Sequence, residues 1–157
     1  MLLNSPKPSG GTYFLLDISA NNGAARVFII EFKIMVGATE YPVSGMTSNS
    51  APVPYVSSAD TVVNTDFAYK AFTKIELIGD RWQAANPYGQ LKLYIGATAI
   101  LPTSIKIRSY GTFAPKDFTF KMNTVDDFST GFTTLTTVTN STGWTASGNG
   151  QERLFLF

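Results

Sequence analysis

Two segments near the middle of the chain, residues 104–108 and 118–122, alternate strictly between apolar and polar positions. The apolar members are Ile105, Ile107, Phe118, Phe120 and Met122. A break containing Gly111 and Pro115 separates them, and a proline at a strand's entry removes no ladder hydrogen bond. A period of two is typical of strands that bury one face. The pattern therefore predicts two β-strands here.

Four other segments predict strands: residues 12–19, 26–36, 132–139 and 153–157. Residues 26–36 give the strongest pattern. Their apolar face is expected to carry Phe28, Ile30, Phe32, Ile34 and Val36, with Glu31 and Lys33 on the other face. The segment 153–157 is apolar on both faces. It is therefore expected either to lie centrally in a sheet or to meet a partner.

One short segment favours a helical turn. In residues 66–72, Ala68, Ala71 and Phe72 fall on one face, and Asn64 or Thr65 can cap the start. Glycine and proline interrupt residues 37–65 often, so loops with short strands are expected there. Residues 1–11 contain little that could pack and predict a flexible N-terminal arm before a single domain over 12–157.

Several of these motifs together resemble discoidin domains, the galactose-binding-like modules related to the C domains of coagulation factors. The resemblance is carried by the strand ending Ile107-Arg108-Ser109, the run from Ala114 to Phe120, and the Thr142-Gly143-Trp144 turn. At the start of the domain it is carried by Tyr13, Phe14, Leu16, Ile18, Asn21, Asn22, Gly23, Ile29, Glu31 and Phe32. The resemblance implies an all-β fold, an antiparallel jelly-roll β-sandwich with one short helical turn. The variant it is most similar to occurs in structural and tail proteins of tailed bacteriophages.

Three places depart from the family pattern. Thr73-Lys74-Ile75 stands where many members have an Asp-Gly-Asn loop that helps bind calcium, and Tyr94 replaces an aspartate. In residues 123–131, Val125-Asp126-Asp127-Phe128 stands where the family has a Ser-x-Asp-Gly-x-x-Trp turn. Calcium needs several oxygen ligands, including carboxylates, so Lys74 argues against the calcium site. No cofactor and no metal are therefore expected.

Composition narrows the function classes for this chain of 157 residues. The net charge is +1 with no block of like charge, so neither a nucleic-acid site nor a membrane-surface patch is expected. Histidine and cysteine are absent, which removes the usual triads of nucleophilic catalysis. No signal peptide and no membrane span are expected. No catalytic residues are predicted, since the acidic residues are scattered; a glycoside hydrolase is the outlying alternative.

Aromatic and planar polar side chains could form a carbohydrate site, because an aromatic face packs on the apolar surface of a sugar ring. The candidates are Tyr55, Arg81, Trp82, Asn86, Tyr88, Tyr110 and Trp144. For Trp82 and Trp144 an anchoring role in the core is the competing interpretation, and Arg81 could simply be paired or solvated.

Two functions stay open. The first is a non-enzymatic bacteriophage virion protein, a capsid decoration or tail component that also engages host-surface glycan. Its expected partners are other virion proteins and copies of itself, and its expected location is the virion. The second is a carbohydrate-binding receptor module of a tail fibre. Both rest on the resemblance. The low charge (15% of residues) suits either a surface covered by partners or a compact β-protein whose surface polarity comes from Thr, Ser and Asn.

Overall fold

The computed structural model describes residues 9–157, which form an all-β structure with antiparallel sheets. The strands are β1 (Tyr13–Asn21), β2 (Phe28–Ile29), β3 (Glu31–Val36), β4 (Thr39–Tyr41), β5 (Val56–Ala59), β6 (Trp82–Gln83), β7 (Gly89–Tyr94), β8 (Ser104–Ser109), β9 (Pro115–Asn123), β10 (Thr133–Val138) and β11 (Gln151–Leu156). Two short 3-10 helices, η1 (Ala68–Phe72) and η2 (Gly111–Phe113), complete the elements. No helix within residues 9–157 is long and apolar enough to cross a membrane.

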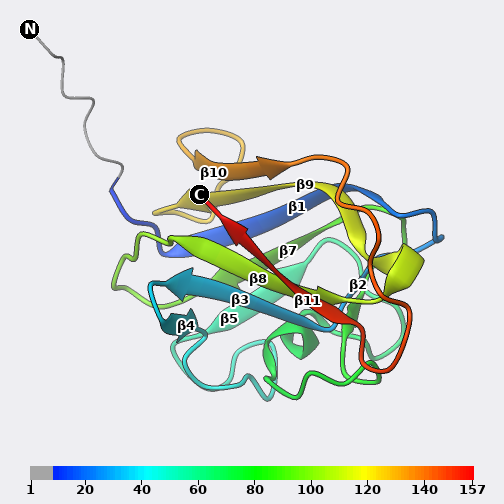
Figure 1. Ribbon diagram of the computed structural model, residues 1–157. Coiled ribbons are helices and arrows are strands. Elements are labelled where there is room, and N and C mark those ends of the chain that lie inside the picture. Colours follow the sequence, from blue (N-terminus) through cyan, green and yellow to red (C-terminus); the bar gives the residue numbers. More distant parts are fainter. Residues whose placement is uncertain (1–8) are drawn as a thin grey trace, which may run out of the picture.

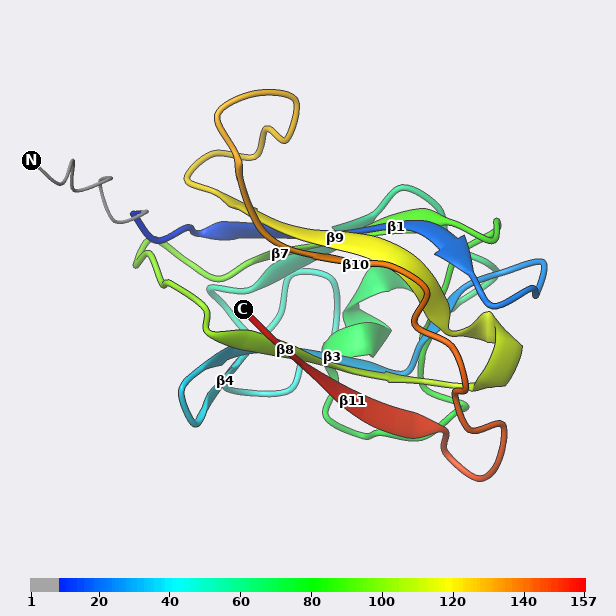
Figure 2. The same ribbon diagram turned by 45° about the horizontal axis from the view of Figure 1, so that its top comes forward.

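Two layers enclose the core. One is a five-stranded sheet in the order β10-β9-β1-β7-β5, and the other is a four-stranded sheet in the order β11-β8-β3-β4 (Figures 1 and 2). β2 and β6 form a small third sheet. Phe120 of β9 lies between the layers, with its ring centroid 5.8 Å from Phe32 of β3 and 5.9 Å from Phe14 of β1. Inward-facing apolar residues from both sheets thus form one continuous core.

The two strands predicted in residues 104–122 are confirmed as β8 and β9, but they lie in opposite layers. β8 pairs with β3 and β11, while β9 pairs with β1 and β10. The chain passes from one layer to the other through η2. Gly111 has φ +48° there, and a Cβ at this position would lie 2.7 Å from Cβ of Ala146. A glycine is required at this crossing.

The prediction of one continuous strand over residues 26–36 is wrong in one respect, because the segment divides at Ile30 into β2 and β3. β2 pairs with β6, whereas β3 pairs with β8 and β4. Glu31 and Lys33 were expected to mark a polar face, yet both are buried. The segment 73–80 covers that outer face and supplies ionic partners, among them Glu76.

The helical turn exists as η1, and the predicted face of Ala68, Ala71 and Phe72 is buried. The expected capping is wrong. The N-cap residue is Phe67, and no side chain caps the turn. Asp66 instead pairs with Lys70, at 3.6 Å between Oδ1 and Nζ. In the segment 37–65, the short strands β4 and β5 and the loops around them match the expectation.

The chain is already paired at Gly11, inside the range predicted as an arm. The amide of Gly11 donates to the carbonyl of Ile100 (2.8 Å), and the reverse bond is 2.9 Å. A Cβ at Gly10 would lie 2.6 Å from the Ile100 oxygen, which explains the small residues here. Residues 1–8 of the predicted arm lie outside the described residues.

Of the two interpretations for the last segment, a central strand is wrong, because β11 lies at the edge of the four-stranded sheet. Alternate residues of β11 face opposite sides, and both sides carry apolar residues, as the sequence predicts. Phe155 points inward against Phe118, with ring centroids 5.1 Å apart, while Leu154 and Leu156 are exposed.

Candidate functional site

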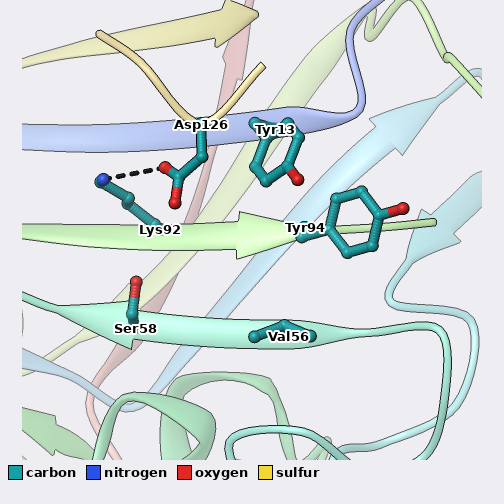
Figure 3. A pocket seen from close by; sticks show the side chains of 6 residues that line it. All are labelled: Tyr13, Val56, Ser58, Lys92, Tyr94 and Asp126. Carbon is teal, nitrogen blue, oxygen red and sulfur yellow. Dashed lines mark hydrogen bonds and ion pairs between the residues drawn. The ribbon is translucent and has the colours of Figure 1, made fainter. Parts of the chain in front are cut away.

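A groove of about 320 Å³ lies on the outer face of the five-stranded sheet. Its floor comes from three neighbouring strands, β1, β7 and β5, and one side comes from the loop between β9 and β10. The lining residues are Tyr13, Val56, Ser58, Lys92, Tyr94 and Asp126 (Figure 3). Strand pairing places most of them. Tyr13 and Val56 both lie opposite Tyr94, and Ser58 lies opposite Lys92.

Two tyrosines form the aromatic end of the groove. The ring centroids of Tyr13 and Tyr94 are 4.7 Å apart, with an angle of 32° between the ring planes. Directly opposite residues of an antiparallel pair project to the same side, so the register of β1 and β7 brings the rings together. Both are partly exposed, and Val56 extends the apolar surface onto β5 (Figure 3).

A lysine–aspartate pair forms the polar part. Nζ of Lys92 lies 3.0 Å from Oδ1 of Asp126, and the ammonium lies 5.8 Å from the ring centroid of Phe128. Both charged side chains keep access to water, at 33% and 56% of their surface. A ligand can therefore receive a hydrogen bond from Lys92 and donate one to Asp126 without displacing a buried pair.

The loop that carries Asp126 is held by its own polar side chains. Asp127 accepts from the amide and the hydroxyl of Ser129, at 2.8 and 2.7 Å, and these bonds hold the pKa of its carboxyl below the ordinary value. Asn123 donates to the carbonyl oxygens of Asp127 and Thr130. Figure 2 shows the loop rising on the outer side of the five-stranded sheet. These contacts position Asp126 over the strands.

Polar residues continue the surface beyond the groove. Asp17 of β1 accepts from Nζ of Lys121 (2.8 Å) and from the side-chain Nε2 of Gln90 (3.2 Å). Leu15 lies on this same face between Lys92 and Lys121, and only 2% of its surface is exposed. The outer face of this sheet is thus polar at one end and aromatic at the other.

Three of the aromatic residues predicted to bind sugar are buried. Trp82 has no exposed surface, and its indole N–H donates to the carbonyl of Thr61 (3.0 Å). Tyr55 is 8% exposed, and its hydroxyl accepts from the amide of Val43. Trp144 is 7% exposed, with the guanidinium of Arg153 4.3 Å from its ring centroid. None of these three side chains offers a free ring face to a sugar. For Trp82 and Trp144 the burial agrees with the competing interpretation, in which they anchor the core.

The other four predicted residues differ in exposure and in their contacts. Arg81 lies over the ring of Phe28 (4.2 Å) and donates to Ile78 and Gln83, so it is engaged within the fold. Tyr88 is 51% exposed, while Asn86 and Tyr110 are half-buried. None of the seven candidates lines the groove of Tyr13 and Tyr94.

Sequence reasoning missed the groove because its residues are far apart in the chain. Tyr94 stands at an outward position of an alternating strand, and that signal was present. β1 gives no such signal at Tyr13, since Phe14, Leu15 and Leu16 are all buried. The proximity of Tyr13 and Tyr94 depends on the pairing of β1 with β7, which periodicity does not specify.

A second charged cluster lies on the outer face of the four-stranded sheet. Lys33 contacts Glu76 and lies 2.8 Å from Glu152, and Arg108 lies 3.1 Å from Glu76. Burial lowers the pKa of Lys33, but the hydrogen bonds to Glu152 and Glu76 outweigh it, so the net pKa is raised. The hydrogen bond from Lys33 lowers the pKa of Glu76. This cluster holds the segment 73–80 onto the sheet.

The segment Thr73-Lys74-Ile75 belongs to this ionic surface. Nζ of Lys74 lies 3.2 Å from Glu40, and Oγ1 of Thr73 donates to Asp80 (2.5 Å). Within residues 9–157, no group of three or more acidic side chains is placed to hold a metal ion. The absence of a cofactor stays a prediction.

No protein-family model, no curated protein and no solved structure matches this chain.

Proposed function

We propose that this chain is a non-catalytic glycan-binding module of the jelly-roll type, whose binding site is the groove of Tyr13, Tyr94, Lys92 and Asp126. The single observation that carries the proposal is the tyrosine pair, 4.7 Å between centroids, beside an accessible Lys92–Asp126 pair. Sugar recognition needs both parts: aromatic surface for the C–H face of the ring, and donors and acceptors for its hydroxyls.

The groove's own chemistry supports binding without hydrolysis. Among its six lining residues, Asp126 provides the one carboxylate, and Lys92 pairs with it. Glycoside hydrolysis ordinarily uses two carboxyl groups, about 5–9.5 Å apart across the scissile bond. A floor of paired strands also suits binding, because it presents the tyrosines on a rigid surface.

Replacing Tyr94 by alanine is expected to weaken glycan binding at least about tenfold, since loss of one stacking face removes roughly 1.4 kcal/mol or more. The glycan is first identified on an array with the labelled full chain. Affinity is then measured by titration calorimetry for the wild type, Tyr13→Ala and Tyr94→Ala.

Tyr88→Ala is the matched control, because Tyr88 is an exposed tyrosine (51%) outside the groove. It is expected to bind as the wild type does. Full affinity in Tyr94→Ala together with loss of binding in Tyr88→Ala would move the site to the loop around Asn86. Circular dichroism of each variant checks that the fold is retained.

A second candidate function is a structural subunit of a tailed-phage particle, which rests on the resemblance to discoidin-like phage proteins. The observation that favours it is the exposed apolar strand at the edge of the four-stranded sheet, where Leu154 and Leu156 are 52% and 75% exposed. Mass spectrometry of purified particles tests this setting. Absence of the chain from any particle would remove the candidate and leave the glycan proposal standing.

A further inference from the structure

The two large sheets have four edge strands, and three of them carry features that discourage pairing with another chain. β4 has three residues and β5 has four. β10 has a register shift between Thr134 and Thr136. Short strands and bulges are the usual means by which a sheet edge avoids association. β11 differs, since its six residues pair with β8 in an unbroken register.

The hydrogen bonds between β11 and the β8 side show which backbone N–H and C=O groups of β11 point away from the sheet. The amide of Phe157 donates to the carbonyl of Thr103 on the β8 side (3.4 Å). In an antiparallel pair the direction of these groups alternates along the strand, so Phe155 and Arg153 also face β8. Leu154 and Leu156 therefore turn their N–H and C=O groups to the edge of the sheet, where no strand of residues 9–157 pairs with them.

The side chains of the same two residues are apolar and exposed. Leu154 is 52% and Leu156 is 75% exposed, on the outer face of the sheet. β11 contains neither lysine nor proline. Its two charged residues are engaged within the chain, Glu152 with Lys33 and Arg153 with the carbonyl oxygens of Thr142 and Gly143, so they protect the edge less than free charges would. Free backbone groups in a row fit an extended strand, which can satisfy donors and acceptors along the whole edge.

We propose that β11 pairs antiparallel with β11 of a second copy of this chain, which joins two four-stranded sheets into one of eight strands. A two-fold axis perpendicular to the sheet aligns the strand antiparallel to itself and keeps each face continuous. With the axis at Leu154, the two Leu154 side chains are direct neighbours, and Leu156 lies opposite Glu152 of the second copy. The net charge of +1 adds little repulsion between the copies.

The test is the mass of the full chain in solution, measured by light scattering and sedimentation over a range of concentrations. The wild type is expected to form a dimer. Leu154→Pro is expected to be a monomer with its fold intact, because the lost N–H faces the free edge and no bond to β8 is removed. Where that variant does not fold, Leu154→Lys with Leu156→Lys replaces it, since charges on an edge oppose pairing.

Val53→Lys is the control for unspecific association, because Val53 is more exposed (86%) but lies in the loop before β5. It is expected to remain dimeric. Amide hydrogen exchange adds a local readout. The amides of Leu154 and Leu156 should exchange more slowly as the concentration rises, while that of Phe155 is protected at every concentration. A wild-type monomer at the highest soluble concentration, or a dimer that survives the β11 variants, would overturn the proposal.

Discussion

Glu31 is a carboxyl group in a position that favours its neutral form. The residue is 1% exposed, and Oε2 accepts from the amide of Lys74 (3.0 Å). Among the described residues Oε1 has no hydrogen-bond partner. Burial raises the pKa of Glu31 to about 8, although the bond from Lys74 and the charge of Lys33 act in the opposite direction. Ionisation of this one group therefore opposes folding.

Because the pKa of Glu31 is higher in the folded chain than its ordinary value of 4.5, the folded state binds more protons between pH 4.5 and 8. Stability contributed by this group is full below the lower value and is lost as pH rises toward the upper one. The loss approaches about 1.4 kcal/mol per pH unit within this window. Urea unfolding at about pH 5, 6.5 and 8, values that span most of this window, measures how the free energy of unfolding falls as pH rises.

Glu31→Gln should flatten this dependence, since the amide keeps the acceptor for Lys74 and does not ionise. Glu76 supplies an internal contrast. Its pKa is lowered, so its contribution is lost as pH falls, and the two effects have opposite signs. An unchanged slope in Glu31→Gln would show that Glu31 is not the group responsible.

At the scale of single residues, the sequence predicted which positions of β8 and β9 alternate but left open which aromatic side chains are exposed. Trp82 was both a sugar-binding candidate and a candidate core anchor; its ring is buried and its N–H is bonded to Thr61. Tyr13 was placed on a predicted strand and Tyr94 was noted as replacing an aspartate of the family pattern, but neither was given a role. Whether an aromatic side chain packs inside or faces solvent depends on which layer covers it, and that is a property of tertiary structure.

The elements themselves were largely predictable, while their pairing was not. β8 and β9 follow from period-two patterns, and β1, β10 and β11 largely coincide with other segments that the sequence predicts as strands. The division of residues 26–36 at Ile30 was missed, because both halves are apolar and only their partners differ. β8 and β9 are consecutive in the chain yet lie in different layers. Periodicity determines which face is buried but not which sheet receives the strand.

The turn before β11 determines how that strand joins the sheet. Gly148 and Gly150 have φ +53° and +74°, a region that favours glycine. A Cβ at Gly148 would meet nothing within 4 Å, whereas one at Gly150 would overlap the carbonyl oxygen of Ser109. The two glycines thus share a left-handed backbone conformation, but a side chain would meet a steric overlap only at Gly150.

Gly148→Ala is expected to reduce the free energy of unfolding by about 1–2 kcal/mol, the cost of the left-handed conformation alone. Gly150→Ala should cost about 2–5 kcal/mol, because steric overlap is added. Chemical denaturation of both variants gives the comparison. Equal losses would mean that the turn moves freely away from Ser109.

The whole molecule is held together where aromatic rings of the two layers meet. Phe120 is fully buried and lies 5.9 Å or less, between centroids, from Phe14, Phe32 and Phe157. Phe120→Ala should lower the free energy of unfolding by about 3–5 kcal/mol. Circular dichroism and tryptophan fluorescence should report one shared transition during urea unfolding, since both layers lose the same contact. Separate transitions would show that the layers unfold independently.

The groove and the free edge lie toward opposite margins of the molecule. β5, which borders the groove, ends one sheet, while β11 ends the other near β9 and β10. A two-fold axis perpendicular to the sheets would leave both grooves open and facing the same direction. Such a pair is bivalent: once one groove holds a surface bearing many identical glycans, the second encounters its ligand at high effective concentration. Weak single contacts would then combine into adhesion that a monomer with the same groove could not sustain.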